Sequence, residues 1–245
     1  MQTGTAPSLA AWLDARRAAI DLALDRYLPG PPAVPPVLSA AMRYSLLAGG
    51  KRLRPALTLA AAEAVAASPA DVDLALPAAC AIEWIHTYSL VHDDLPAMDD
   101  DSLRRGRPTS HVVHGEGLAV LAGDGLLTEA FGLLAREPVT LDPALVARKL
   151  RTVAIVAEAA GAAGMVGGQA LDLAAAGQVR SAPATPLDAP QLRAMHARKT
   201  GALIRAAAVA GAVMAGGDEA RIAAIGRYAD ELGLAFQIVD DILDV

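Results

Sequence analysis

Apolar positions recur at helical spacing along almost the whole chain. Near the N-terminus this period is carried by Leu9, Trp12, Leu13 and Ile20, with Ser8 as the candidate N-cap. Ala and Leu, both strong helix formers, supply many of the remaining positions. No segment alternates Val, Ile or Thr over the length of a strand. The pattern therefore predicts helices and no β-sheet.

Clusters of Pro, Gly and polar residues divide this pattern into separate helices. Breaks are predicted at PGPPAVPP (29–36), AGGKRLRP (48–55), the polar loop 95–115 and the stretch 174–190. Between them the spacing predicts a helix over 37–47, one that follows Pro55, a long one that ends at Asp94, and helices over 116–136, 143–174, 188–215 and 218–245. The sequence shows no fixed repeat and no clear linker. We therefore expect one all-α domain over 1–245, with its helices packed around a common core.

The composition predicts a core of aliphatic and small side chains. Hydrophobic residues fill 54% of the 245 positions, but aromatic residues only 3%. A chain of this length can bury a sizeable core without disulfides or structural metals. Cys80 is the only cysteine and lies in the apolar run LPAACAI, so we expect a buried thiol and a reducing compartment.

The charge distribution argues against several classes of protein. A net charge of -6 does not suit a general nucleic-acid binder, which needs a basic face. Charged residues interrupt the runs that come nearest to a membrane span, namely Glu83, Arg136, Glu158, Arg205 and Asp218. The first residues lack the basic and apolar segments of a secretory signal. We therefore expect a cytoplasmic protein with no membrane span and no nucleic-acid partner.

Five aspartates lie within nine positions of the stretch HDDLPAMDDDSLRRGRPT (92–109). A charge run is usually a solvated surface, but Asp93 and Asp94 follow the apolar run SLV, at the end of a helix that should be buried. Crowded carboxylates in such a setting need a cation, and Mg²⁺ suits oxygen ligands. On one ideal helix Asp93 and Asp99 would point about 240° apart. Pro96 breaks that helix, so we expect the chain to curl and bring Asp99 back towards Asp93.

A second acidic cluster lies in FQIVDDILDV (236–245). Asp240 and Asp244 are four residues apart and so share one helical face, beside apolar neighbours. Alone, this cluster would be an ordinary exposed stripe. Together with the first cluster, it favours two facing carboxylate sites around several metal ions.

A third element, GGKRLRP (49–55), is basic. Lys51, Arg52 and Arg54 follow paired glycines in a predicted turn. Arg binds phosphate oxygens with two parallel hydrogen bonds and Lys adds a point charge, so this turn is a candidate anion site. In an acidic protein with two metal-type clusters, it suggests a second phosphate-bearing substrate that is held without metal.

The motifs follow one another as GGKRLRP, HTYSLVHDDLPAMDDDSLRRGRPT, GGQALDL, KTGALIRAA and FQIVDDILDV. In order and spacing, from about Leu38 to Val245, the chain resembles the trans-prenyl diphosphate synthases, above all the bacterial farnesyl diphosphate synthases. The resemblance implies an isoprenoid-synthase-type bundle of antiparallel helices around a central cavity, usually in a homodimer. It also implies that the family's C-terminal helices are absent from this polyprenyl synthetase domain, because the chain stops at Val245.

The resemblance also implies roles for individual residues. Three Mg²⁺ ions are expected on Asp93, Asp99 and Asp240, with secondary roles for Asp94, Asp241 and Asp244. The allylic diphosphate is expected on Arg104, Lys199, Thr200 and Gln237. Isopentenyl diphosphate is expected on Lys51, Arg54, His86 and Arg105. Gln169 and Asp172 are expected to face the cavity, and the helix is expected to kink at the step Lys199–Thr200–Gly201.

One aromatic residue bears on product length. Tyr88 lies five residues before Asp93, where the family uses an aromatic side chain as the floor of the hydrocarbon pocket. On an ideal helix the two residues point about 140° apart, so helical geometry alone does not predict this role. On the strength of the resemblance we expect the floor role and a C15 product.

The implied reaction condenses isopentenyl diphosphate with dimethylallyl and geranyl diphosphates to give farnesyl diphosphate, by ionisation, condensation and proton loss. A geranylgeranyl or geranyl diphosphate synthase is the nearest alternative. A terpene cyclase would not need the basic motifs. A non-catalytic regulatory subunit is favoured only by the chain end at Val245. A generic acidic helical scaffold leaves the order of the motifs unexplained.

Overall fold

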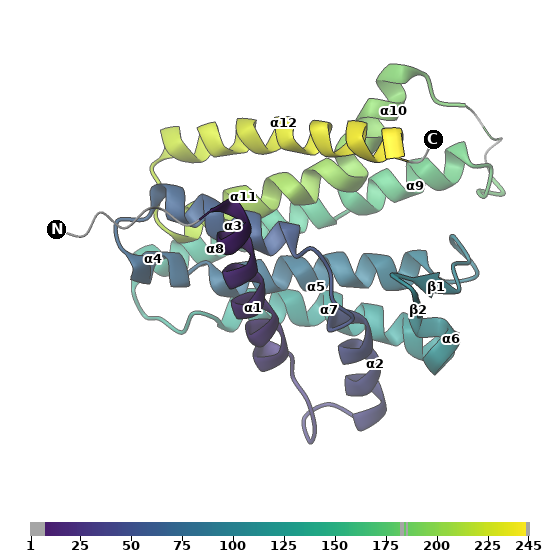
Figure 1. The fold of residues 1–245 in the computed structure, drawn as a ribbon, viewed down its shortest axis with the longest axis horizontal. Helices are drawn as coiled ribbons and strands as arrows, with labels where there is room; N and C mark the ends of the chain where they lie inside the picture. The colour runs from purple at the N-terminus through teal and green to yellow at the C-terminus, as the bar shows by residue number, and fades with distance from the viewer. Residues whose placement is uncertain (1–7, 182–183, 185, 244–245) are drawn as a thin grey trace.

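The computed structural model describes residues 8–181, 184 and 186–243, with side chains described as far as Val239. Helices dominate it (Figure 1). In chain order the elements are α1 (Leu9–Tyr27), α2 (Pro36–Leu46), α3 (Leu53–Val65), α4 (Pro69–Asp73), α5 (Leu76–Asp93), β1 (Leu103–Arg104), β2 (Arg107–Pro108), α6 (Ser110–His114), α7 (Glu116–Arg136), α8 (Pro143–Ala160), α9 (Met165–Ala175), α10 (Ala189–His196), the π-helical turn η1 (Ala197–Gly201), α11 (Ala202–Met214) and α12 (Glu219–Leu243).

The long helices run roughly along the long axis of the molecule. In Figure 1, α12 lies across the top, α11 and α9 lie below it, and α5 and α7 fill the lower half, while α1 and α2 cross more steeply. In contact are α5 with α7 and α1, α2 with α7, and α11 with both α3 and α12, while α9 packs on η1. The expected all-α bundle is confirmed.

The core is centred on α5 and α11. On α5 the side chains of Cys80, Trp84 and Ile85 are completely buried, which confirms the expected buried thiol. On α11 every residue from Leu203 to Met214 is buried except Arg205. Because these helices are apolar on almost every face, they must be covered on almost every face. That requirement places them at the centre of the bundle.

Helix starts follow the expected capping chemistry. The side-chain oxygen of Ser8 accepts a hydrogen bond from the backbone nitrogen of Ala11 at 3.2 Å, so the predicted cap of α1 is confirmed. Asp142 and Asp188 cap α8 and α10 in the same way. Each cap satisfies donors that the helix itself leaves unpaired.

The loop predicted over 95–115 contains a short β-hairpin and the helix α6 instead. Strands β1 and β2 pair antiparallel (Figure 1). Their two-residue turn has positive φ at both positions, 55° at Arg105 and 75° at Gly106, which matches the twist of paired strands. The prediction of no β-sheet is therefore wrong here. Strands of two residues are too short to show an alternating pattern.

Two helices that the sequence predicts as continuous are modified. The predicted helix 143–174 is divided into α8 and α9 by a turn over 161–164. A Cβ at Gly164 would lie 2.1 Å from the carbonyl oxygen of Ala159, so glycine is needed there. The predicted helix 188–215 instead contains the π-helical turn η1 between α10 and α11.

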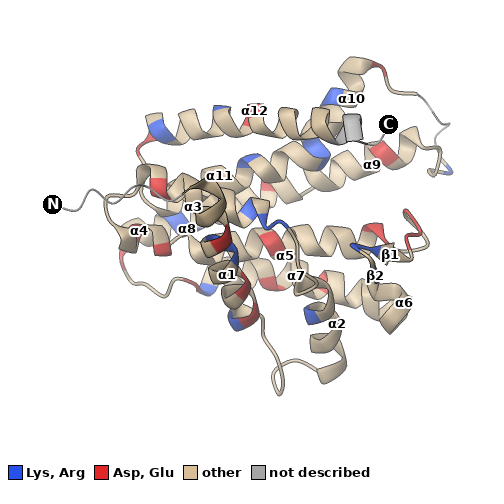
Figure 2. Cartoon of the chain, viewed as in Figure 1, with Lys and Arg blue, Asp and Glu red and all other residues tan. Residues whose placement is uncertain are grey.

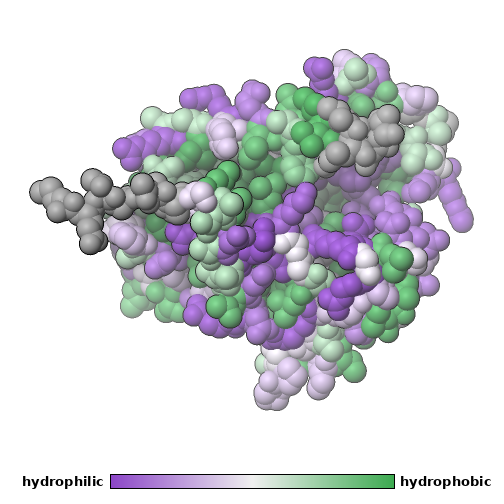
Figure 3. All heavy atoms as spheres, in the orientation of Figure 1, coloured by the Kyte–Doolittle hydropathy of each residue, from purple (hydrophilic) through white to green (hydrophobic). Residues whose placement is uncertain are grey.

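Three helical stretches are long and apolar enough to span a membrane by length and composition alone, namely Pro69–Asp93, Glu116–Arg136 and Pro143–Ala175. This departs from the expectation that charges interrupt every such run. Within the protein, 72% of the first window is buried, against 39% and 33% of the other two. Burial in the core therefore accounts for the apolar character of the first stretch. The visible surface mixes hydrophilic and hydrophobic residues (Figure 3).

Gly211 lets α11 approach α3 so closely that a Cβ there would lie 2.0 Å from the carbonyl oxygen of Thr58. We expect Gly211→Ala to lower the free energy of unfolding by about 1–3 kcal/mol, because the two backbones must move apart. Urea denaturation followed by circular dichroism measures this. Gly117→Ala in α7 is the control, since a Cβ there meets nothing within 4 Å. Equal stability of Gly211→Ala and the parent protein would contradict the close contact.

Candidate active site

The chain curls back at the end of α5, as the sequence predicts. Asp93 closes the helix, and the backbone nitrogen of Asp99 donates to the carbonyl oxygen of Asp93 at 2.9 Å. Asp100 adopts a left-handed conformation with φ of 55°, and its nitrogen donates to the carbonyl oxygen of Leu95 at 3.1 Å. The turn therefore brings two residues of the first aspartate cluster together, although one continuous helix would separate them.

A cavity of about 360 Å³ opens beside Asp93, between α5, α9 and η1. Its walls include seven residues that the sequence analysis assigns to the site: Arg54, His86, Tyr88, Asp93, Gln169, Lys199 and Thr200. Much of the remaining wall is apolar, with Leu90, Met98, Met165, Val166 and Leu173. The cavity thus combines a polar end with a lining suited to a hydrocarbon.

The π-helical turn η1 carries Lys199 and Thr200 into this cavity. It packs closely on α9, because a Cβ at Gly168 would lie 2.3 Å from the backbone nitrogen of Lys199. The ammonium of Lys199 pairs with the carboxylate of Asp172 at 2.5 Å. A π-helical turn re-aims side chains within a helix and is frequent at functional sites. The helix is therefore irregular at the step where the sequence predicts a kink.

Asp93 is held in an environment that disfavours its charge. Burial raises the pKa of its carboxyl to about 6; the ammonium of Lys199 opposes this shift and the carboxylate of Asp99 adds to it. A nearby cation would favour the ionised form of such a carboxyl. The chemistry of the two carboxylates fits Mg²⁺, which is often bound by one or two carboxylates together with water and substrate phosphates. In the described part of the chain, no three metal-ligating side chains come together.

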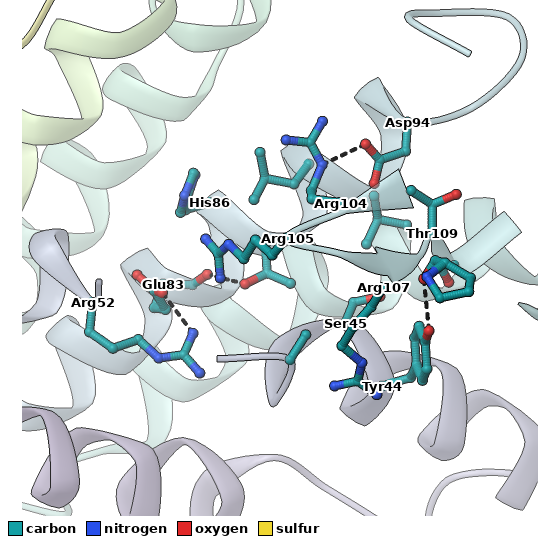
Figure 4. A pocket seen from close by; sticks show the side chains of 16 residues that line it. Tyr44, Ser45, Arg52, Glu83, His86, Asp94, Arg104, Arg105, Arg107 and Thr109 are labelled. Atoms are coloured by element: carbon teal, nitrogen blue, oxygen red, sulfur yellow. Dashed lines mark hydrogen bonds and ion pairs between the residues drawn. The ribbon is translucent and has the colours of Figure 1, made fainter. Parts of the chain in front are cut away.

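A second, basic pocket lies on the other side of α5 (Figure 4). Arg104 and Arg105 enter it from the hairpin, and His86 lines both this pocket and the main cavity. Burial lowers the pKa of His86 well below its ordinary 6.5, and the charges of Arg54, Arg105, Arg104 and Arg52 lower it further. Several cations that repel one another around a neutral histidine form a site that an anion would stabilise.

Arg54 is half-buried as a residue, but part of its guanidinium is fully enclosed. Its Nε atom is buried without a hydrogen-bond partner among the described residues, and burial lowers the pKa of the guanidinium. Because an unpaired buried charge is costly, Arg54 points to a ligand that would satisfy it. It lines the main cavity together with His86.

Asp94 is occupied by an arginine. The Nε atom of Arg104 donates to its Oδ1 at 2.6 Å (Figure 4). An Nη atom of Arg104 lies 3.4 Å from the carboxylate of Asp101. Burial raises the pKa of Asp94, and the hydrogen bond from Arg104 opposes the shift. The two adjacent aspartates therefore have different roles: Asp93 lines the main cavity, and Asp94 orients Arg104.

Other predicted site residues lie elsewhere. Lys51 is exposed and lines neither pocket, and the same two linings do not include Asp99. Gln237 lines a separate groove of about 600 Å³ between α10, η1 and α12. The side chains of Asp240 and Asp241, and the whole of Asp244, lie outside the described part of the chain. The facing of two aspartate clusters therefore stays a prediction.

The sequence analysis missed one contributor, His92, and assigned the wrong role to Arg52. His92 lines the main cavity, stacks edge-on against Tyr88 with ring centroids 5.6 Å apart, and lies 3.0 Å from the carbonyl oxygen of Val120. The sequence analysis places Arg52 in the candidate anion site, but its guanidinium instead forms hydrogen bonds to Asp21, Glu83 and the carbonyl oxygen of Leu46. The spacing of His92 four residues after Tyr88 is the signal that could have found the first.

Known proteins are similar to this chain in sequence and in fold. Residues 35–245 match the family described as polyprenyl synthetase. The chain is 46% identical over 242 residues to the farnesyl diphosphate synthase of Geobacillus stearothermophilus, covering 97% of this chain and 76% of that protein. It is 43% identical over 238 residues to the geranylgeranyl diphosphate synthase of Cyanophora paradoxa, covering 97% and 75%. The crystal structure of an FPP/GFPP synthase from Zymomonas mobilis matches with a TM-score of 0.85 and 40% identity, covering 96% of this chain and 81% of that one.

The environment of His86 gives a prediction that needs no catalysis. We expect its imidazole to titrate below its ordinary pKa of 6.5 in the free protein. Bound inorganic diphosphate should raise that pKa, because a nearby anion favours the imidazolium. NMR titration of the imidazole protons measures both values, with His86→Gln identifying the resonance. A midpoint at or above 6.5 in the free protein would contradict the arrangement of burial and arginine charge.

Proposed function

The chain belongs to the polyprenyl synthetase family and is a trans-prenyltransferase, and on that premise we propose how its site works and what it makes. It condenses isopentenyl diphosphate with dimethylallyl and geranyl diphosphates and forms farnesyl diphosphate. One observation carries the proposal: a largely apolar cavity lined by Asp93 and Lys199 adjoins a separate basic pocket, with His86 lining both. Two diphosphates and one hydrocarbon chain can be accommodated together there.

The two pockets divide the substrates between them. Lys199 and Thr200 bind the allylic diphosphate at the polar end of the main cavity, and its hydrocarbon chain extends along the apolar wall. Arg54, His86 and Arg105 bind isopentenyl diphosphate. The position of His86 in both linings supports this division, because the two reacting carbons must meet between the two diphosphates.

We assign Mg²⁺ to the acidic end of the cavity. Asp93 and Asp99 are its ligands, and Asp240 is the proposed ligand from the second cluster, with three ions expected when substrate is bound. When bound, Mg²⁺ stabilises negative charge on the diphosphate leaving group. The raised pKa of Asp93 supports the assignment, because a cation would relieve the crowding of carboxylates.

The protein's own residues supply the remaining steps. Lys199 and Arg104 stabilise charge on the departing diphosphate, and the apolar wall shields the allylic cation from water. The double bond of isopentenyl diphosphate attacks that cation, and a proton is lost from the product carbon. The released diphosphate is the proposed proton acceptor, so no side chain is needed as the general base.

Product length is decided at the floor of the cavity. Tyr88 is buried and lines the cavity together with Asp93, which supports its role as the floor. A C15 product accords with the farnesyl diphosphate synthase of Geobacillus stearothermophilus, whereas the relative from Cyanophora paradoxa is a geranylgeranyl diphosphate synthase. Geranylgeranyl diphosphate is therefore the alternative product.

We also propose a cytoplasmic homodimer. Large apolar side chains are exposed on α6 and at the start of α7, at Val112, Val113, Val120 and Leu121. Exposed large apolar side chains on two neighbouring helices support contact with a second copy. Cytoplasmic location accords with the single buried cysteine, which needs no oxidising compartment.

Asp93→Ala tests the acidic end. We expect turnover to fall by about 100-fold or more, because stabilisation of the leaving group is lost, while the helical circular dichroism stays unchanged. Incubation with Mg²⁺, isopentenyl diphosphate and each allylic diphosphate, followed by chromatography, measures it. Asp14→Ala, on the exposed face of α1, is the matched control. Activity in Asp93→Ala at the parent level would remove this carboxylate from the mechanism.

Tyr88→Ala tests the floor. We expect longer products than those of the parent protein, because the smaller side chain deepens the cavity. Chromatographic sizing of the reaction products measures the shift, and Tyr228→Ala at an exposed position on α12 serves as the control. Unchanged product lengths would show that Tyr88 does not limit the chain.

A further inference from the structure

We propose that Glu83 is a positioning residue of the basic pocket: its buried carboxylate anchors Arg52, and through Arg52 it fixes the loop that presents Arg54 and receives Arg105. The inference deepens the proposed function and rests on it, since the anion concerned is isopentenyl diphosphate. Figure 4 shows Glu83 and Arg52 in contact on one side of the pocket, with His86, Arg104 and Arg105 beyond them.

The ion pair between Glu83 and Arg52 is buried on both sides. An Nη atom of Arg52 donates to Oε1 of Glu83 at 2.9 Å, and the two side chains are 3% and 4% exposed. The Nε atom of Arg52 donates to Asp21 at 2.8 Å, and its other Nη atom donates to the carbonyl oxygen of Leu46 at 2.8 Å. All three nitrogens of the guanidinium are therefore engaged, so Arg52 ties α5 to α1 and α2 and is not free to bind a substrate.

The anchor acts on a backbone that needs support. Arg52 has a left-handed conformation with φ of 49°, directly before α3 begins. For a residue other than glycine this conformation is costly and persists only where the surroundings enforce it. Arg54 lies two residues later and turns into the main cavity, while the carbonyl oxygen of Gly49 accepts a hydrogen bond from Arg105. One fixed residue thus sets the place of both cations.

Glu83 also balances the charge of the pocket. Its carboxylate attracts Arg52, Arg54 and Arg105, and in each case it opposes the unfavourable effect of burial on the guanidinium. Only Arg52 forms an ion pair with it. Within the described residues, Arg54 and Arg105 form no ion pair with a carboxylate. Glu83 therefore favours the gathering of three arginines near His86, while the fourth, Arg104, pairs with Asp94. Arg54 and Arg105 stay available to a ligand.

Comparison of Glu83→Ala with Glu83→Gln distinguishes a positioning role of the Glu83 side chain from a packing role. Glu83→Ala removes one of the three acceptors of Arg52. It should raise KM for isopentenyl diphosphate by about tenfold or more, roughly the loss of one charge-assisted hydrogen bond. KM for the allylic diphosphate should change by less than about threefold, since Lys199 and Thr200, its proposed ligands, lie on η1 and not on this loop. Glu83→Gln keeps an oxygen that accepts from Arg52, so we expect it to restore KM to within about threefold of the parent value.

Glu63→Ala is the matched control. Glu63 pairs with Arg16 and accepts a hydrogen bond from Trp12, and it lines neither the basic pocket nor the main cavity. Its loss should lower stability without changing either KM. If Glu83→Ala behaved like this control, or raised both KM values equally, the carboxylate would be merely structural and the inference would be overturned.

Two further measurements keep the test decisive. If Glu83→Ala fails to fold, the double variant Arg52→Met/Glu83→Leu replaces the buried ion pair by apolar side chains. An unchanged KM for isopentenyl diphosphate in the folded double variant would refute the inference. A raised KM would support it. Calorimetric binding of inorganic diphosphate without Mg²⁺ does not depend on turnover. Weaker binding by Glu83→Ala than by the parent would support the anchor even if the parent made no prenyl product, and equal binding would overturn it.

Discussion

Burial of charge on α5 is the constraint on which the site depends. This helix passes through the centre of the bundle, yet it carries Glu83, His86 and Asp93. A charge removed from water must find a partner or give up its charge. Glu83 finds Arg52, His86 becomes harder to protonate, and Asp93 lies near Lys199 with its pKa raised. In the two pockets, the buried charges are only partly paired by other groups of the protein.

The incompletely paired charge is positive on one side of α5 and negative on the other. On one side arginines crowd around a histidine that resists protonation, and only part of their charge is matched by Glu83. On the other side Asp93 and Asp99 crowd together, and only part of their charge is matched by Lys199. A substrate diphosphate suits the first site and a metal-bound diphosphate suits the second. The proposed function uses this difference in chemistry to hold two similar anions in separate pockets.

Rigid elements fix these charges in position. The hairpin β1–β2 brings Arg104 and Arg105 to the pocket, the π-helical turn η1 aims Lys199, and the curl after Asp93 returns Asp99 to the end of α5. None of the three is regular α-helix. Each holds side chains that the 3.6-residue period would point elsewhere, which is how a bundle of plain helices acquires a polar site.

The sequence by itself determined the helices, the breaks between most of them, and the two chemistries of the first acidic cluster and the basic turn, because apolar period and residue type are local properties. Only the tertiary structure decided the partners. Periodicity places Tyr88 and Asp93 about 140° apart, yet both line one cavity, because the cavity wraps around the end of α5. The engagement of Arg52 by Glu83, the turn at Gly164 and the contact of Lys199 with Asp172 join residues distant in sequence or depend on close backbone approach. No local pattern encodes such contacts.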